Sequence, residues 1–235
     1  MGAGLQIYNN NNILQIDSAF KNIQFIDKHQ ITVSSQYVYD GSLGNTLDIR
    51  STSLTLDAYL NSFFACRVEN GLSVTWSEIY PKDGSSPGIN FIGDNGAIVT
   101  IYRFSYASIP AGQCFEVMNS SGERVFSDTA KFLKVLDSRT GYAGGKLSTG
   151  YVLGSTSHSS SIKTAVAVGG CYWLTENDNY AQTGYAWRQG YTFNSTETIG
   201  FCKQIINGKY MTNYTYKDTR LNYNYHYFVI DVTGL

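Results

Sequence analysis

Apolar and polar residues alternate with a period of two along much of this chain, which is the pattern of β-strands with one buried face. Residues 31–39 and 54–58 show the alternation, and residues 97–106 form a longer apolar strand. Asp-Gly and Asn-Gly pairs follow several of these segments and favour hairpin turns. Residues 81–97 are rich in Pro, Gly, Ser and Asn and are expected to form a loop. The pattern predicts an all-β protein.

One stretch of the sequence occurs twice. Residues 5–27 read LQIYNNNNILQIDSAFKNIQFID, and residues 115–137 read FEVMNSSGERVFSDTAKFLKVLD, so the two align without a gap at an offset of 110. The identical pairs are Asn9 and Asn119, Lys21 and Lys131, and Asp27 and Asp137. Each copy predicts a strand, a polar turn, a second strand, a short link and a third strand. The alternative is that two unrelated hairpins look alike by chance.

The repeat predicts how the chain is organised. A period of about a hundred residues is far longer than the repeats of solenoid proteins. We therefore expect two related β-sandwich-like units built around the repeated element, or one pseudo-symmetric body. The boundary is expected near residues 107–113, which gives units at 1–110 and 111–235.

Composition narrows the range of partners. Charged residues make up 15% of the chain, below the roughly 25% of average proteins, which argues against many exposed helices. The net charge is −1 and no basic block is present, so no nucleic-acid partner is expected. No apolar run approaches the ~18 residues of a membrane span, and the first residues lack the pattern of a signal peptide.

Candidate catalytic and metal-binding groups are sparse. The sequence contains no phosphate-binding loop, dinucleotide fingerprint, calcium loop or nucleophile elbow. His158 lies in a serine-rich loop, while Glu176, Asp178 and Glu197 lie near an aromatic segment and are most simply solvated turn residues. We therefore predict no catalytic residue, no metal site and no cofactor. The cysteines lack metal-ligand spacing and are expected to be free, buried thiols; they are Cys66, Cys114, Cys171 and Cys202.

The segment 175–198 is the best candidate for a binding surface. It interleaves aromatic residues with small polar ones, and aromatic side chains give rigid contact area with a polar handle. The alternative is that this segment is a pair of strands with packed aromatic residues around a glycine turn. The candidate receptor-binding residues are Tyr180, Tyr185, Trp187, Arg188 and Tyr191.

Three segments together resemble the small tail proteins of tailed bacteriophages. They are the opening GLQIYNNNNILQIDSAFKNIQFI, the second copy of the repeat at 115–137, and the final FVIDVTGL. Residues 28–110 and 138–220 carry less of the resemblance. The motifs are structural and not catalytic, so no binding residue can be transferred from the family.

The resemblance implies a virion protein of the distal tail, either at the tail tip or in a tail fibre, that is assembled in the host cytoplasm. The N-terminal unit is then expected to contact the tail or neighbouring subunits, and the C-terminal unit to contact a host-surface glycan or outer-membrane protein. The setting also implies a homo-oligomer such as a trimer. The alternatives are a purely structural tail-tip or fibre subunit and, less favoured, a tail-associated enzyme that degrades glycans.

Overall fold

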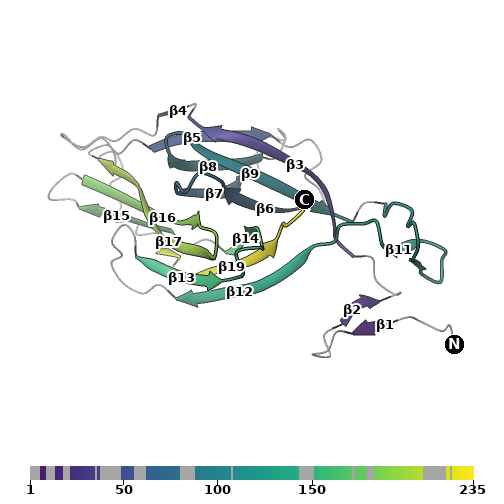
Figure 1. The fold of residues 1–235 in the computed structure, drawn as a ribbon. Coiled ribbons are helices and arrows are strands. Elements are labelled where there is room, and N and C mark those ends of the chain that lie inside the picture. The colour runs from purple at the N-terminus through teal and green to yellow at the C-terminus, as the bar shows by residue number, and fades with distance from the viewer. Residues whose placement is uncertain are drawn as a thin grey trace.

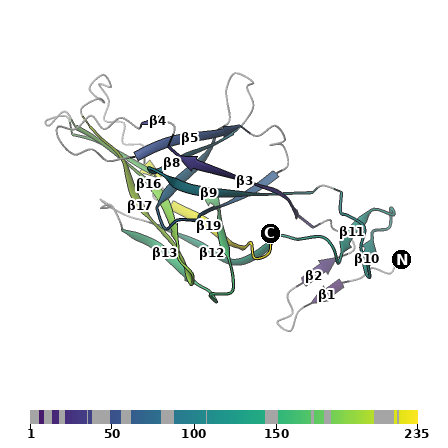
Figure 2. The same cartoon turned by 45° about the horizontal axis from the view of Figure 1, so that its top comes forward.

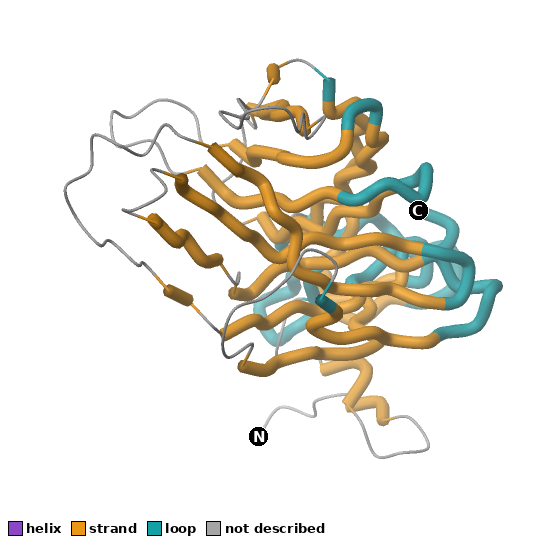
Figure 3. Tube along the Cα trace, turned by 90° about the vertical axis from the view of Figure 1, so that its left-hand side faces the viewer, coloured by secondary structure: helices purple, strands orange, loops and turns teal. Residues whose placement is uncertain are grey.

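The computed structural model describes residues 6–8, 14–17, 22–34, 36–37, 49–55, 62–79, 88–106, 108–142, 151–170, 173–178, 183–208, 221–222 and 224–235. This part of the chain consists of strands and their connections, without a helix, which confirms the all-β class (Figure 3). Within these ranges there is accordingly no helix of the length and apolar character needed to span a bilayer.

Two large antiparallel sheets form the body of the molecule (Figure 1). The six-stranded sheet has the order β12 (Lys134–Tyr142), β19 (Asn224–Asp231), β14 (Thr164–Gly170), β6 (Ser62–Val68), β9 (Ala97–Ser105) and β3 (Gln24–Val33). The nine-stranded sheet has the order β13 (Val152–Ser157), β17 (Glu197–Gly208), β16 (Thr183–Phe193), β7 (Val74–Ile79), β8 (Gly88–Asp94), β5 (Ile49–Thr55) and β4 (Gln36–Tyr37). Of its two further strands, β15 (Trp173–Asp178) pairs with β16, and β18 (Leu221–Asn222) pairs with β15.

The main hydrophobic core lies between the two sheets. The six-stranded sheet contributes Cys66, Ile101 and Val229, and the nine-stranded sheet contributes Trp76 and Phe91, all of them in one buried cluster. Alternate residues of each strand supply this core because successive side chains point to opposite faces of a sheet. The two sheets therefore form a sandwich.

The outer face of the six-stranded sheet is also apolar and covered. Ala65, Tyr102 and Phe104 are buried there in a second cluster, against which Ile23 and Leu133 pack. Burial on both faces explains why β9 reads as a nearly continuous apolar run, with the burial of its residues hardly alternating.

Two hairpins outside the sandwich repeat one another. They pair β1 (Gln6–Tyr8) with β2 (Leu14–Asp17), and β10 (Glu116–Met118) with β11 (Arg124–Ser127). Adding 110 to the bounds of the first hairpin gives those of the second, and every registered pair is reproduced, including a bulge after the second residue. We call them the paired hairpins. They lie side by side at one end of the molecule in both views (Figures 1 and 2).

The duplication extends through both sheets. The sandwich strands of the first half, β3, β5, β6, β7, β8 and β9, correspond in order to β12, β13, β14, β16, β17 and β19 of the second half. In each sheet the three strands of one half meet the three of the other in mirrored order, at β6–β14 and at β7–β16. Each of these two junctions is an antiparallel pair of corresponding strands, and a two-fold axis normal to the sheet exchanges two such strands. The two halves of the chain are therefore related by an internal pseudo-two-fold axis.

Small residues and a short bridge mark this axis. The register that pairs Cys66 with Val166 places Ala65 opposite Ala167, and both alanines are buried. Outside the sheet, Leu133 N–H donates to the carbonyl oxygen of Ile23 at 2.9 Å. Ile23 and Leu133 are themselves related by the offset of 110. The two-fold rotation therefore exchanges Ile23 with Leu133, and likewise Ala65 with Ala167.

The two halves of the sequence are thus the two halves of one sandwich. Each half contributes three strands to the six-stranded sheet, and the first and second halves contribute four and five strands to the nine-stranded sheet. Residues from both sides of position 110 share the main core. The segment 107–113 connects the halves in sequence, whereas in space they meet along the pseudo-two-fold axis. Of the two arrangements expected from the repeat, the observed one is a single pseudo-symmetric body.

Two local expectations were wrong. The predicted loop 81–97 contains strand β8, whose Ile89 and Phe91 are core residues despite the flanking Gly and Pro. Cys66 and Cys114 form no disulfide, as predicted, but Cys114 is exposed and not buried. Cys171 lies outside the described residues, as does the side chain of Cys202.

Candidate functional site

Apart from the two-residue strand β4, which has no counterpart beyond β13, the strands of the two halves differ at one place. In the first half β6 runs into β7 through residues 69–73 alone, whereas in the second half β15 lies between β14 and β16. β15 pairs with β16 and with β18, and β16 and β17 are 11 and 12 residues long where β7 and β8 have 6 and 7. We call β15, β18 and the paired parts of β16 and β17, 183–188 and 203–208, the extension.

The extension lies at the opposite end of the molecule from the paired hairpins (Figure 1). The aromatic segment 175–198 supplies β16 and most of β15, which pair with each other as the alternative of paired strands expected. The packing of its aromatic residues around a turn, the other part of that alternative, lies outside the described residues. Tyr185, Trp187 and Arg188 lie on β16, the middle strand, between β15 and β17. Arg188 pairs in register with Trp173 on β15. Tyr180 lies outside the described residues, and for the other three the structure gives strand positions only.

Tyr191 belongs to the core and not to a surface. Its side chain is 1% exposed. The ring lies with its centroid 4.6 Å from that of Trp76 and 5.4 Å from that of Tyr227. It is also paired with Val74 where the two halves meet in the nine-stranded sheet. In this fold Tyr191 supports the root of the extension and offers no area to a receptor.

The paired hairpins form a second candidate surface, which sequence reasoning assigned only to structure. Phe115 and Met118 are exposed large apolar residues on the second hairpin. Phe115, Phe126 and Phe132 form a row of ring contacts with centroid distances of 5.9 and 4.9 Å. An isolated two-stranded hairpin is marginally stable in water. Exposed aromatic area on such an element is typical of a contact with another protein.

The base of the second hairpin is held by a carboxylate. Asp128 accepts hydrogen bonds from the backbone N–H groups of Gln113 and Cys114, each at 2.9 Å. These donors, Gln113 first, hold the pKa of Asp128 below its usual value. The turn itself is closed by Asn119, whose side-chain oxygen accepts from the N–H groups of Ser121 and Glu123. The hairpin is therefore a formed element and not a loose arm.

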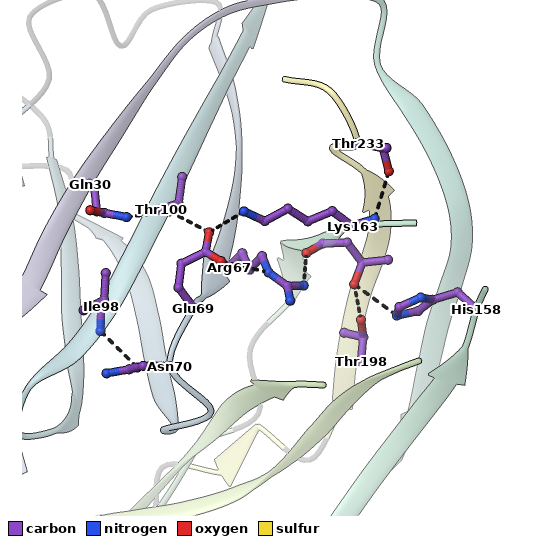
Figure 4. A network of polar contacts seen from close by, with 11 residues as sticks. Gln30, Arg67, Glu69, Asn70, Ile98, Thr100, His158, Lys163, Thr198 and Thr233 are labelled. Atoms are coloured by element: carbon purple, nitrogen blue, oxygen red, sulfur yellow. Dashed lines mark hydrogen bonds and ion pairs between the residues drawn. The ribbon is translucent and has the colours of Figure 1, made fainter. Parts of the chain in front are cut away.

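The densest polar network joins the two halves of the chain near the outer face of the six-stranded sheet (Figure 4). Glu69 accepts from Lys163 Nζ at 2.9 Å and from Thr100 Oγ1 at 2.8 Å. Arg67 donates to Glu69 at 3.2 Å and to the carbonyl oxygen of Thr164 at 2.8 Å. Glu69 and Arg67 belong to the first half, and Lys163 and Thr164 to the second.

The charges and hydrogen bonds of this network keep the Glu69 carboxylate ionised. Partial burial acts to raise the pKa of Glu69, but the hydrogen bonds from Lys163 and Thr100 and the positive charges of Lys163 and Arg67 outweigh it and lower that pKa. A carboxylate held ionised by cations is poorly suited to act as a general acid. The network therefore fits a role in fixing β6 to β14, and no motif in the sequence singled out Glu69 for it.

Other groups considered for chemistry have local structural partners. The Glu197 carboxylate accepts a hydrogen bond from the side-chain amide of Asn194 within the turn between β16 and β17. His158 contacts Thr164, which contacts Thr198 at 2.7 Å, and His226 contacts Ser138. The side chains of Glu176 and Asp178 lie outside the described part. Across the described residues, no three His, Cys, Asp or Glu side chains gather as a metal site would require.

Comparison of the chain with protein-family models, with curated proteins and with solved structures gives no significant match in any of the three. The functional argument therefore depends on the sequence and on the geometry of this fold.

Proposed function

We propose that the protein is a non-enzymatic component of a bacteriophage tail, located at the distal tail and taking part in attachment to the host surface. The observation that carries the proposal is the extension, which adds β15 and β18 to one half of a duplicated scaffold and lengthens β16 and β17. A scaffold of two related halves gives two related surfaces. A surface present in only one half has its own function, and the candidate residues Tyr185 and Trp187 lie on the strands of this extension.

The two ends of the molecule suit two different contacts. The paired hairpins carry the repeated element of the tail-protein resemblance and expose Phe115 and Met118, so they are the end that docks on other tail proteins. The extension lies at the opposite end, where a host glycan or outer-membrane protein can be reached (Figure 1). Several copies on one tail would convert weak single contacts into firm attachment through avidity.

A purely structural tail subunit is the second candidate, and the exposed apolar residues of the second hairpin favour it. Such a subunit would use both ends for contacts within the tail. A glycan-degrading enzyme would need two carboxyl groups held about 5–10 Å apart across a glycosidic bond. The ion-paired Glu69 does not supply that arrangement.

The test is made on intact virions. Particles carrying Tyr185→Ala and Trp187→Ala are compared with the wild type and with Tyr106→Ala, an exposed tyrosine outside the extension. Incorporation is measured by blotting, position by immunogold labelling, and attachment by the rate of adsorption. We expect distal labelling in all three, and slow adsorption only in the doubly substituted particles.

The other outcomes separate the alternatives. Normal incorporation with unchanged adsorption in the doubly substituted particles would favour the structural subunit. Absence of the protein from purified virions, tested after denaturation, would refute the tail assignment. New reducing ends after incubation of the purified protein with host capsule or lipopolysaccharide would refute the non-enzymatic assignment.

A further inference from the structure

One side of the sandwich exposes an unusual amount of apolar surface. It is formed by the edge strands β12 and β13, which lie at corresponding ends of the two sheets. Five of the eight exposed large apolar residues in the described part of the chain lie on these strands or next to them. They are Val135, Leu136, Tyr142, Tyr151 and Val152.

The corresponding edge strand of the first half, β3, can be compared with β12 position by position. Residues 28–30 of β3 are exposed and read Lys-His-Gln, and their counterparts 138–140 on β12 are exposed and read Ser-Arg-Thr, so the middles of both strands are polar. The two strands differ on either side of this stretch, where Tyr142 of β12 stands in place of Thr32 of β3. Phe25 and Ile26, which correspond to Val135 and Leu136, are half-buried, whereas Val135 and Leu136 are 52% and 40% exposed. The two edges share a backbone but differ in their surface.

We propose that β12 pairs with β12 of a second copy of this chain. The pairing is antiparallel about a two-fold axis at Ser138, and it joins the six-stranded sheets of the two copies into one continuous sheet. In the described structure β12 is paired only with β19, which leaves its other edge open to a further strand. An exposed edge with apolar side chains is a template for this kind of pairing.

Charge complementarity selects this register. Asp137 and Arg139 lie one residue to either side of Ser138. Antiparallel pairing centred on Ser138 therefore places Asp137 of each copy opposite Arg139 of the other. Within one chain the two groups already lie 2.7 Å apart, and both contact Thr156 Oγ1 on β13. The side chains are thus ordered before a partner arrives, which reduces the entropy lost on binding.

The apolar residues fit the same register. β12 has nine residues, so full overlap gives a contact about 30 Å long. A bulge leaves Leu136 without a partner on β19, between Val135 and Asp137. Because the bulge adds one residue to β12, Val135 and Leu136 together lie opposite Thr140 of the second copy. Tyr142 of that copy occupies the diagonal position and packs over them. The exposed apolar area of β12 is then buried in the contact.

Cysteine crosslinking tests the register. The background is Cys114→Ser, which removes the exposed thiol of the described part of the chain. In this background Ser138→Cys is compared with Lys28→Cys, the corresponding position on β3, and with the background alone. Mild oxidation should produce a disulfide-linked dimer with Ser138→Cys only, because residue 138 then faces itself across the axis. A Ser138→Cys protein that is no more crosslinked than the Lys28→Cys protein would refute the pairing.

Sedimentation velocity over a concentration series tests the contact. We expect the wild type to reach twice its 26.1 kDa mass, and Arg139→Glu or Leu136→Lys to weaken association roughly tenfold or more. Asp137→Arg combined with Arg139→Asp restores the opposed charges and should restore the dimer. A monomeric wild type, or an oligomer of any size unaffected by these changes, would overturn the proposal. These assays use the purified protein, so their outcomes do not depend on whether the protein is a tail component. Unchanged adsorption of the substituted virions would count against the proposed function and not against the pairing of β12.

Discussion

Replacement of Tyr191 by alanine should destabilise the whole protein. The ring is 1% exposed and packs against Trp76 and Tyr227, so it joins one side chain of each sheet. It is also paired with Val74, where the two halves meet. The cavity left by the ring would therefore lie at the centre of the sandwich, where neither sheet can move inward without disturbing the other half.

The magnitude follows from the burial. Removing a fully buried aromatic side chain costs about 3–5 kcal/mol, and aromatic contacts contribute roughly 0.5–1.5 kcal/mol each beyond the buried area. For a chain of this size 1 kcal/mol lowers the melting temperature by about 2–4 °C, so Tyr191→Ala should lower it by roughly 6–20 °C. Tyr191→Phe keeps the ring and should retain most of the stability.

Thermal melts and urea titrations followed by circular dichroism measure the effect. Tyr106→Ala is the matched control, because that ring is 54% exposed and its loss should change stability by less than about 0.5 kcal/mol. If Tyr191→Ala unfolds within about 1 kcal/mol of the wild type, the core position is refuted. The result also affects adsorption experiments, since slow adsorption by this variant would report unfolding and not a lost receptor contact.

Three further outcomes are expected. Glu69→Gln should lower the free energy of unfolding by about 1 kcal/mol at neutral pH. Because the folded-state pKa of Glu69 is lowered, the difference in unfolding free energy between the variant and the wild type should shrink as the pH falls through that pKa. Unfolding measured over an acid pH series tests this. Gly141→Ala should cost about 1–3 kcal/mol in urea titrations, because a Cβ there would overlap the hydroxyl group and the ring of Tyr225. Tyr225→Leu in the same chain should recover part of the loss. Under native conditions a thiol reagent should modify Cys114 rapidly and Cys66 only after unfolding, as followed by mass spectrometry.

The repeated element was predictable because its signal is local. A strand, a polar turn and a second strand within about twenty residues depend on neighbouring residues, and the offset of 110 carries over to every registered pair of the two hairpins. The bulge in β3 between Phe25 and Asp27 also recurs in β12 between Val135 and Asp137. Both features are set by sequence that the two copies share.

Pairing between distant strands could not be predicted in the same way. The junctions β6–β14 and β7–β16 join residues about a hundred positions apart, and nothing in either strand alone specifies its partner. The strand β8 was missed because Gly and Pro next to it favour a loop, while its Ile89 is stabilised by burial in the sandwich. The burial of Tyr191 depends on the same long-range packing, so its place in an aromatic-rich segment made this residue appear more exposed than it is.

The internal two-fold axis separates residues that maintain the fold from residues that are free to differ. Ala65 and Ala167 lie opposite each other on the axis, and a larger side chain on either would press on its counterpart and on the bridge of Ile23 and Leu133 above them. Away from the axis each position has a counterpart in a similar backbone setting, so packing alone gives little reason for the two to differ. The extension and the apolar edge of β12 are two places where they differ, and the host contact and the β12 pairing proposed above would account for these differences.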